Sequence, residues 1–284
     1  MLEYLLITIA IAMCAIGSYT DLRIREVPDW LNFAGIVTGV GVHLIGAVML
    51  WKGWFLLESV FGLGIGFGIG ALMYYSGQWG GGDSKMLMAL GALIGFMPKI
   101  DNLFFSLLVY TAILGGLYGL VYSFVLAVKN WKKFLAELNK LLTEIRLLRK
   151  VLFAIIVAGL FLIVFIDDIL FKLLFGYFLI VVPLLLCLYY CIKAVEQCCM
   201  LQYVSPSLVT EGDWIAKDII VAYKRICGPK DLGITKPQLA LLQNLGQQGK
   251  IKKVLIKYGI PFVPSFLMGL VAALLLKNPL AYIL

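Results

Sequence analysis

The chain has 284 residues, of which 62% are hydrophobic and 14% are charged, and its formal net charge is +8. Soluble domains average about 45–50% apolar and about 25% charged residues, so this composition excludes an ordinary soluble protein and predicts an integral membrane protein. The positive charge is assigned to membrane topology and not to nucleic-acid binding, because the basic residues gather in alternate loops between apolar runs.

Eight apolar runs are candidates for membrane spans, each of which needs about 20 residues. They are Leu2–Tyr19, Leu31–Leu50, Trp54–Tyr75, Lys85–Phe96, Leu103–Val128, Val151–Ile166, Ile169–Ile192 and Gly259–Leu276. The first is interpreted as a retained span, because it lacks the basic start and the cleavage site of a signal peptide. The fourth is short, which predicts a tilted or partly buried helix. The expected fold is an all-α polytopic membrane protein with about eight transmembrane helices.

Basic residues follow the odd-numbered spans. Arg23 and Arg25 follow the first, Lys85 the third and a basic run the fifth, and lysines are frequent in residues 193–258 after the seventh. Basic loops stay in the cytoplasm, so these junctions are predicted to be cytoplasmic and the N-terminus to lie outside the cytoplasmic membrane.

Five parts are expected along the chain. Residues 1–128 form a membrane core, residues 129–150 an amphipathic basic helix at the cytoplasmic surface, and residues 151–192 a transmembrane hairpin. Residues 193–258 form a cytoplasmic segment and residues 259–284 contain the last span. Within the cytoplasmic segment, Thr235 followed by Pro237 predicts a helix start, and the helix should end near Gly246 or Gly249.

Metal-binding patterns are weak in this sequence. The six cysteines form no CxxC pair, and His43 is the only histidine, so no metal or other cofactor is expected. His43 lies within the second span and is interpreted as a packing residue or a helix contact.

Two carboxylates are predicted to lie at the same membrane face. Asp21 ends the first span and Asp83 begins the fourth, which places both at the cytoplasmic side, whereas Glu58 lies near the opposite face. Two carboxyl groups that meet in a site of low dielectric constant share one proton and can act as general acid and general base on one water. Gly80 and Gly82 precede Asp83, and we expect them to allow the backbone to approach a substrate strand closely and to adopt unusual backbone angles.

Other interpretations of these residues remain open. Asp83 alone is a common helix N-cap, and Asp21 alone could end a span and pair with Arg23. An ion- or proton-coupled transporter could use both aspartates as ligands, although transporters favour polar or broken helices at mid-membrane. A structural subunit of a pilus-like machine is a third class. A Ser84–Lys85 dyad is disfavoured, because adjacent helix residues do not face each other.

The aspartate motifs resemble those of a known family. Asp21 within SYTDLRIREVPDWLN, and Asp83 within GGGDSKM at residues 80–86, are similar to the two motifs of type IV prepilin peptidases, the second being Gly-x-Gly-Asp. Residues 208–219, 233–239 and 257–270 resemble the archaeal branch, which includes preflagellin (prearchaellin) peptidases. The resemblance covers residues 1–128 and about 193–276, and makes residues 151–192 an addition to a six-span core.

The resemblance implies an aspartyl membrane endopeptidase that cuts class III signal peptides from pilin or archaellin precursors at the cytoplasmic face. Asp21 and Asp83 would be the catalytic pair, with Gly80 and Gly82 as motif glycines. No N-methyltransferase activity is expected, because the CxxC motif of the bacterial members is missing. Four acidic residues are candidate contacts for a basic leader, although ordinary solvated loops are the alternative: Glu26, Asp29, Glu211 and Asp213. The identity of the precursor and the oligomeric state stay open.

Overall fold

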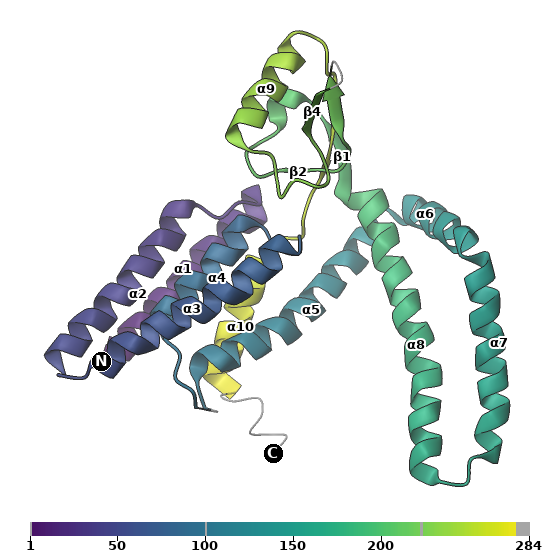
Figure 1. The fold of residues 1–284 in the computed structure, drawn as a ribbon, viewed down its shortest axis with the longest axis horizontal. Helices are drawn as coiled ribbons and strands as arrows, with labels where there is room; N and C mark the ends of the chain where they lie inside the picture. The colour runs from purple at the N-terminus through teal and green to yellow at the C-terminus, as the bar shows by residue number, and fades with distance from the viewer. Residues whose placement is uncertain (1, 100, 222–223, 277–284) are drawn as a thin grey trace. The chain divides into compact units, whose positions relative to one another are not determined.

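The computed structural model describes residues 2–99, 101–221 and 224–276, and helices dominate it (Figure 1). The chain divides into two compact units, Met1–Val121 with Val204–Leu284, and Tyr122–Tyr203. The prediction of an all-α polytopic membrane protein is confirmed in its class, because the chain has six helices long and apolar enough to cross a membrane within the described residues.

The membrane helices begin and end close to the predicted runs. They are α1 (Leu2–Ile24), α2 (Asp29–Met49), α3 (Gly53–Tyr75), α4 (Gly81–Ile94), α5 (Leu103–Lys129), α7 (Arg146–Leu162), α8 (Ile169–Val195) and α10 (Val263–Leu276). Both α4 and α10 have 14 residues and are shorter than a full span, so the number of eight transmembrane helices stays a prediction.

Helix α4 lies at the centre of the first unit, packed against α1, α2 and α3. Most of its apolar side chains, among them Leu87 and Leu90, are fully buried, as expected for a short and partly buried helix. Glycines line the face of α3 toward α4, and a Cβ atom at Gly66 would lie 2.7 Å from the carbonyl oxygen of Leu87. This close approach lets Ser59 Oγ donate to the carbonyl oxygen of Ala92 at 2.7 Å. The small residues of α3 therefore allow α4 to pack closely against it.

Residues Val204–Tyr258, which we call the β-α subdomain, contain most of the short strands. The strands of the chain are β1 (Leu201–Val204), β2 (Trp214–Ile215), β3 (Ile219–Val221), β4 (Lys224–Cys227) and β5 (Val254–Lys257). β2 pairs antiparallel with β5, and β3 pairs antiparallel with β4. Helix α9 (Lys236–Gln247) starts after Thr235 and ends beside Gly246, which confirms the predicted helix. The strands were not anticipated, because they are too short for an alternating pattern.

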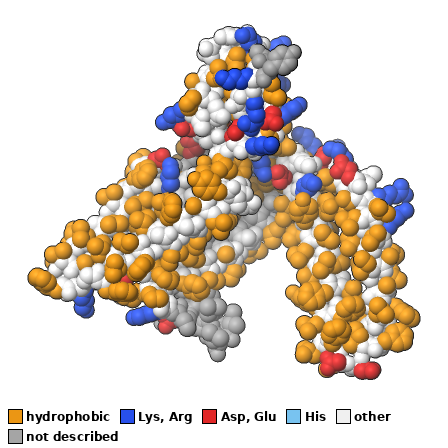
Figure 2. All heavy atoms as spheres, viewed as in Figure 1, with side chains coloured by type: hydrophobic (Ala, Val, Ile, Leu, Met, Phe, Trp, Pro, Cys, Tyr) orange, Lys and Arg blue, Asp and Glu red, His pale blue; other side chains and the backbone are white. Residues whose placement is uncertain are grey.

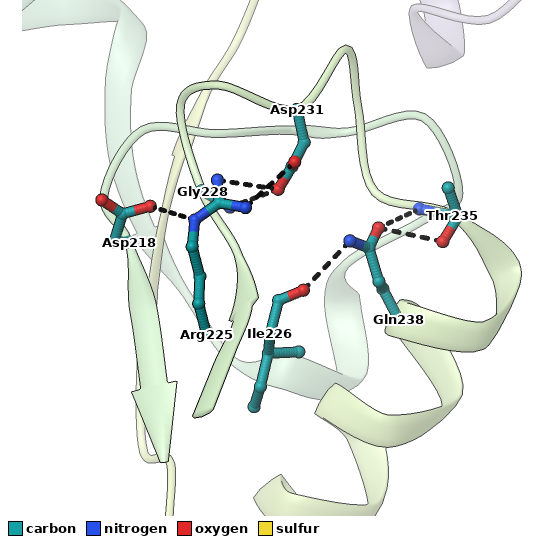
Figure 3. Close-up of polar contacts among 7 residues, drawn as sticks. All are labelled: Asp218, Arg225, Ile226, Gly228, Asp231, Thr235 and Gln238. Carbon is teal, nitrogen blue, oxygen red and sulfur yellow. Dashed lines mark hydrogen bonds and ion pairs between the residues drawn. The ribbon is translucent and has the colours of Figure 1, made fainter. Parts of the chain in front are cut away.

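Polar contacts hold the β3–β4 hairpin to its neighbours (Figure 3). Arg225 lies between two carboxylates, with its Nε 2.8 Å from Asp218 and its Nη1 3.1 Å from Asp231. Gln238 on α9 donates to the carbonyl oxygen of Ile226 at 3.0 Å. These contacts, together with a core around Leu242 and Ile256, give the β-α subdomain an interior of its own.

The second unit is a helical hairpin preceded by α6 (Trp131–Glu144). The predicted basic helix over residues 129–150 is divided in the structure, because α6 ends at Glu144 and residues Arg146–Lys150 begin α7. A short 3₁₀ turn (Ile163–Phe165) leads to α8, whose first turn is capped by Asp168. Hydrophobic side chains cover α7 and α8, and Lys and Arg gather around α6 and the start of α7 (Figure 2). This distribution is typical of a membrane hairpin with one basic end.

Candidate active site

Asp21 lies in the last turn of α1 and is almost completely buried, with 6% of its surface exposed. The backbone N–H of Val263 donates to its Oδ2 at 3.0 Å. Val263 is the first residue of α10, so a helix N-terminus faces the Asp21 carboxylate, and this arrangement stabilises a negative charge. The bond joins residues 242 positions apart, which places the last apolar helix in the site.

Asp83 is the third residue of α4 and is half-buried. Its Oδ2 accepts a hydrogen bond from the backbone N–H of Gly80 at 3.1 Å, so the carboxylate closes the first turn of its own helix. The expectation of unusual backbone angles at the motif glycines is wrong at Gly80, which has an ordinary extended conformation with φ −73° and ψ 165°. Gly82 instead allows the start of α4 to pack closely against Val27, because a Cβ atom at Gly82 would lie 3.1 Å from Cβ of Val27.

The structure brings the two aspartates to the same end of the helical core. Gly17, one turn before Asp21, packs directly against Met86 of α4, one turn after Asp83. The last turn of α1 and the first turn of α4, which carry the two carboxyl groups, therefore lie at the same end of this packed pair of helices. Two carboxyl groups held this way can divide the roles of proton donor and proton acceptor toward one water.

Aromatic rings join the glycine loop to the start of α10. The ring of Trp79, immediately before Gly80, lies 5.1 Å from that of Phe262 and 5.4 Å from that of Phe266. The loop that leads into α4 and Asp83 is therefore packed on the segment that donates to Asp21. The sequence placed Phe262 and Val263 within the last predicted span and gave them no role in the site, because no local pattern shows which distant carboxylate a backbone N–H will reach.

The β-α subdomain lies against the same loop. Tyr74 on α3 donates its hydroxyl hydrogen to the carbonyl oxygen of Leu232 at 3.2 Å. A Cβ atom at Gly77, which has φ +70°, would lie 3.7 Å from the ring of Trp214. At the end of α1, the guanidinium of Arg25 lies 4.6 Å from the centre of the Tyr258 ring. Three contacts thus connect the subdomain to chain segments next to the aspartates, namely the end of α1 and the α3–α4 connection.

Three of the four candidate acidic contacts have partners within the chain. Asp29 forms an ion pair with Lys85 at 2.6 Å, and Glu211 lies 3.6 Å from Lys236 Nζ. Asp213 accepts a hydrogen bond from the backbone N–H of Thr210 at 2.8 Å. Glu26 is exposed in the turn between α1 and α2. Glu26 and Asp29 lie around the start of α2, whereas Glu211 and Asp213 lie in the β-α subdomain, and each of the three paired residues has a different partner.

His43 lies away from the aspartates, near the other ends of α1 and α2. It is buried, its Nδ1 is 2.8 Å from the carbonyl oxygen of Gly39, and its ring packs on Phe55. These contacts agree with the interpretation of His43 as a packing residue. Glu58 lines a cavity with His43 and Glu3 and is likewise remote from Asp21. Among the described residues, no group of three or more His, Cys, Asp or Glu side chains is arranged to hold a metal ion.

Comparison with known proteins identifies the part of the chain that carries this site. Residues 8–127 match the type IV leader peptidase family. A protein named prepilin peptidase EppA from Methanothermobacter thermautotrophicus is 33% identical over 102 residues, which cover 35% of this chain and 26% of that protein. A preflagellin peptidase from Methanococcus maripaludis is 36% identical over 122 residues, which cover 43% of this chain and 47% of that protein. The matches span about a quarter and about half of the two relatives, and no solved structure matches the chain. The resemblance predicted from the two aspartate motifs is confirmed over this part.

Proposed function

We propose that this chain, whose residues 8–127 match the type IV leader peptidase family, is a membrane aspartyl endopeptidase that removes short leader peptides from type IV pilin-like or archaellin precursors. The observation that carries the proposal is the placement of Asp21 and Asp83 on separate helices, α1 and α4, which pack together one turn away through Gly17 and Met86. The two named relatives support this choice of substrates, and neither supports the transporter alternative.

The proposed chemistry needs one carboxyl group ionised and the other protonated. The ionised carboxylate takes a proton from water as the water oxygen bonds to the scissile carbonyl carbon, and the protonated carboxyl gives its proton to the carbonyl oxygen. The tetrahedral intermediate then collapses: its hydroxyl returns a proton to the second carboxylate, the C–N bond breaks, and the first carboxyl protonates the leaving amine. Each aspartate regains its starting state, and one water is consumed for each peptide bond.

The chain would contribute orientation as well as the two acids. Backbone donors fix one oxygen of each carboxyl group, Val263 N–H at Asp21 and Gly80 N–H at Asp83. A fixed carboxylate needs little rearrangement as charge develops in the transition state. Under this proposal residues 1–128 form the catalytic core, and helix α10 (Val263–Leu276) completes it.

The site is proposed to face the cytoplasm, with the N-terminus outside the cytoplasmic membrane. The support is the distribution of basic residues, which follow the odd-numbered predicted spans and surround α6 and the start of α7 (Figure 2). In this orientation the precursor keeps its apolar helix in the membrane and presents its leader to Asp21 and Asp83. We expect no N-methyltransferase activity and no nucleic-acid partner.

The test is a cleavage assay with membranes that contain the protein and a tagged prepilin or prearchaellin. We expect Asp21→Asn and Asp83→Asn each to abolish loss of the leader, read by gel shift and mass, while the variants elute as folded protein. Glu58→Gln is the matched control, because it makes the same change at a carboxyl remote from the pair. Cleavage by either aspartate variant at the wild-type rate would contradict the proposal.

A further inference from the structure

Asn32 is a buried polar residue beside the glycine motif. It lies on α2, none of its surface is exposed, and its Nδ2 lies 3.4 Å from the carbonyl oxygen of Gly82. Gly82 directly precedes Asp83. A side chain from another helix thus donates to the peptide group that links the glycine motif to Asp83.

The arrangement leaves half of the Asn32 amide unsatisfied. Its Oδ1 is buried and has no hydrogen-bond partner among the described residues. Reversing the amide would not help, because Oδ1 would then face the carbonyl oxygen of Gly82, and two acceptors repel each other. A buried acceptor without a partner costs folding free energy, and a bond of 3.4 Å offsets little of that cost. An apolar side chain of the same shape would be the more stable choice at this position.

Neighbouring contacts show that the start of α2 holds the start of α4. Val27, just before α2, packs against Gly82, and Asp29 pairs with Lys85. Asn32 is one turn further along α2 than Asp29 and is the buried member of this set. The exposed ion pair contributes little in water, whereas the buried Asn32 amide is directed at the Gly82 carbonyl oxygen and, with Val27, limits where the Gly82 peptide can lie.

We propose that Asn32 is a positioning residue for Asp83, retained for the geometry of the aspartate pair at a cost in stability. The inference rests on the proposed peptidase function. Buried polar groups that weaken a fold are concentrated at functional sites, and small displacements of a catalytic group lower the rate steeply. Asn32 acts through the Gly82 carbonyl and need not contact the substrate.

The test compares Asn32→Leu with Ser59→Ala in the full-length protein. Ser59 is a suitable control because it is equally buried and also donates to a backbone carbonyl of α4, that of Ala92, away from Asp83. For Asn32→Leu we expect kcat to fall about 10- to 100-fold with KM within about twofold, and a melting temperature equal to or above that of the wild type. For Ser59→Ala we expect the reverse: a melting temperature lower by about 2–4 °C and an unchanged kcat.

A purely structural role for Asn32 would lower the melting temperature and the activity together, and that result would overturn the proposal. Unchanged kcat in Asn32→Leu would overturn it as well. Hydrogen exchange of the peptide that contains residues 80–84 gives a second readout that does not need a substrate. Faster exchange there in Asn32→Leu than in Ser59→Ala supports the positioning role even if the wild type cuts none of the precursors offered, whereas equal exchange contradicts it. Failure of the proposed function and failure of this inference are therefore distinguishable.

Discussion

The donor from α10 to Asp21 can be removed with a single substitution, Val263→Pro. Proline lacks the backbone N–H that donates to Asp21 Oδ2. Its ring fixes φ near the helical value, and the first position of a helix, which Val263 occupies, is where proline is best tolerated. The ring also fills a volume similar to that of the valine side chain. The substitution therefore deletes one hydrogen bond and leaves the helix in place.

The expected effect follows from the burial of Asp21. A hydrogen bond to a charged group contributes about 1.5–3 kcal/mol, and only 6% of Asp21 is exposed, so water cannot readily replace the lost donor. If the bond supports the carboxylate in the transition state, the barrier rises by the same amount. At about 1.4 kcal/mol for each factor of ten, kcat should fall roughly 10- to 150-fold.

The assay is the rate of leader removal at saturating precursor. Val263→Ala is the matched control, because it trims the buried side chain but keeps the N–H that donates to Asp21. We expect Val263→Ala to lower stability and to retain most of kcat. Wild-type kcat in Val263→Pro, or an equal loss in both variants, would refute the argument that this N–H supports Asp21.

Two further predictions concern packing and ionisation. Gly66→Leu should keep α3 and α4 from packing together, because a Cβ atom at Gly66 would lie 2.7 Å from the Leu87 carbonyl oxygen. Gly68→Leu is the control and should fold normally, because a Cβ atom at Gly68 would have no atom within 4 Å. We expect a lower melting temperature for Gly66→Leu than for Gly68→Leu, and equal melting temperatures would contradict the prediction. Burial, with a smaller effect of Asp231, raises the pKa of the Cys227 thiol from 9.0 to about 11. Cys227 should therefore resist alkylation at pH 8 until the protein is denatured, as mass spectrometry of its peptide would show. Its contribution to stability should be complete below about pH 9 and decline toward pH 11, because the folded protein then holds a proton that the unfolded chain releases.

Those parts of the fold that depend on local composition could be predicted from the sequence. An apolar run long enough to cross a membrane is expected to form a helix, because the bilayer offers no water to hydrogen-bond its backbone N–H and C=O groups. The helix after Thr235 was recognisable from its cap and from Pro237, which fits only the first turn. The common membrane face of Asp21 and Asp83 could also be predicted. Asp21 ends the first span and Asp83 begins the fourth, and the two spans between them return the chain to the same face of the membrane.

Contacts that depend on distant pairing could not be predicted. β2 has only two residues, and its partner β5 lies about forty positions later, so neither segment carries a recognisable alternation. The motif glycines were expected to allow close approach of a substrate strand and unusual backbone angles, whereas in the structure Gly80 has ordinary angles and Gly82 packs against Val27. The partner of a glycine is visible only once the helices are packed.

The most consequential contact of this kind lies outside the matched segment. Residues 8–127 contain both aspartates, yet a backbone donor to Asp21 comes from Val263, and the rings packed on Trp79 are Phe262 and Phe266. The segment that resembles the peptidase family therefore holds the acids but not all the groups that orient them. The β-α subdomain ends at Tyr258, shortly before α10 begins at Val263, and its Trp214 lies near Gly77 in the loop between α3 and α4. The backbone donor to Asp21 therefore depends on where the chain leaves the β-α subdomain and begins α10, which a family match limited to residues 8–127 does not include.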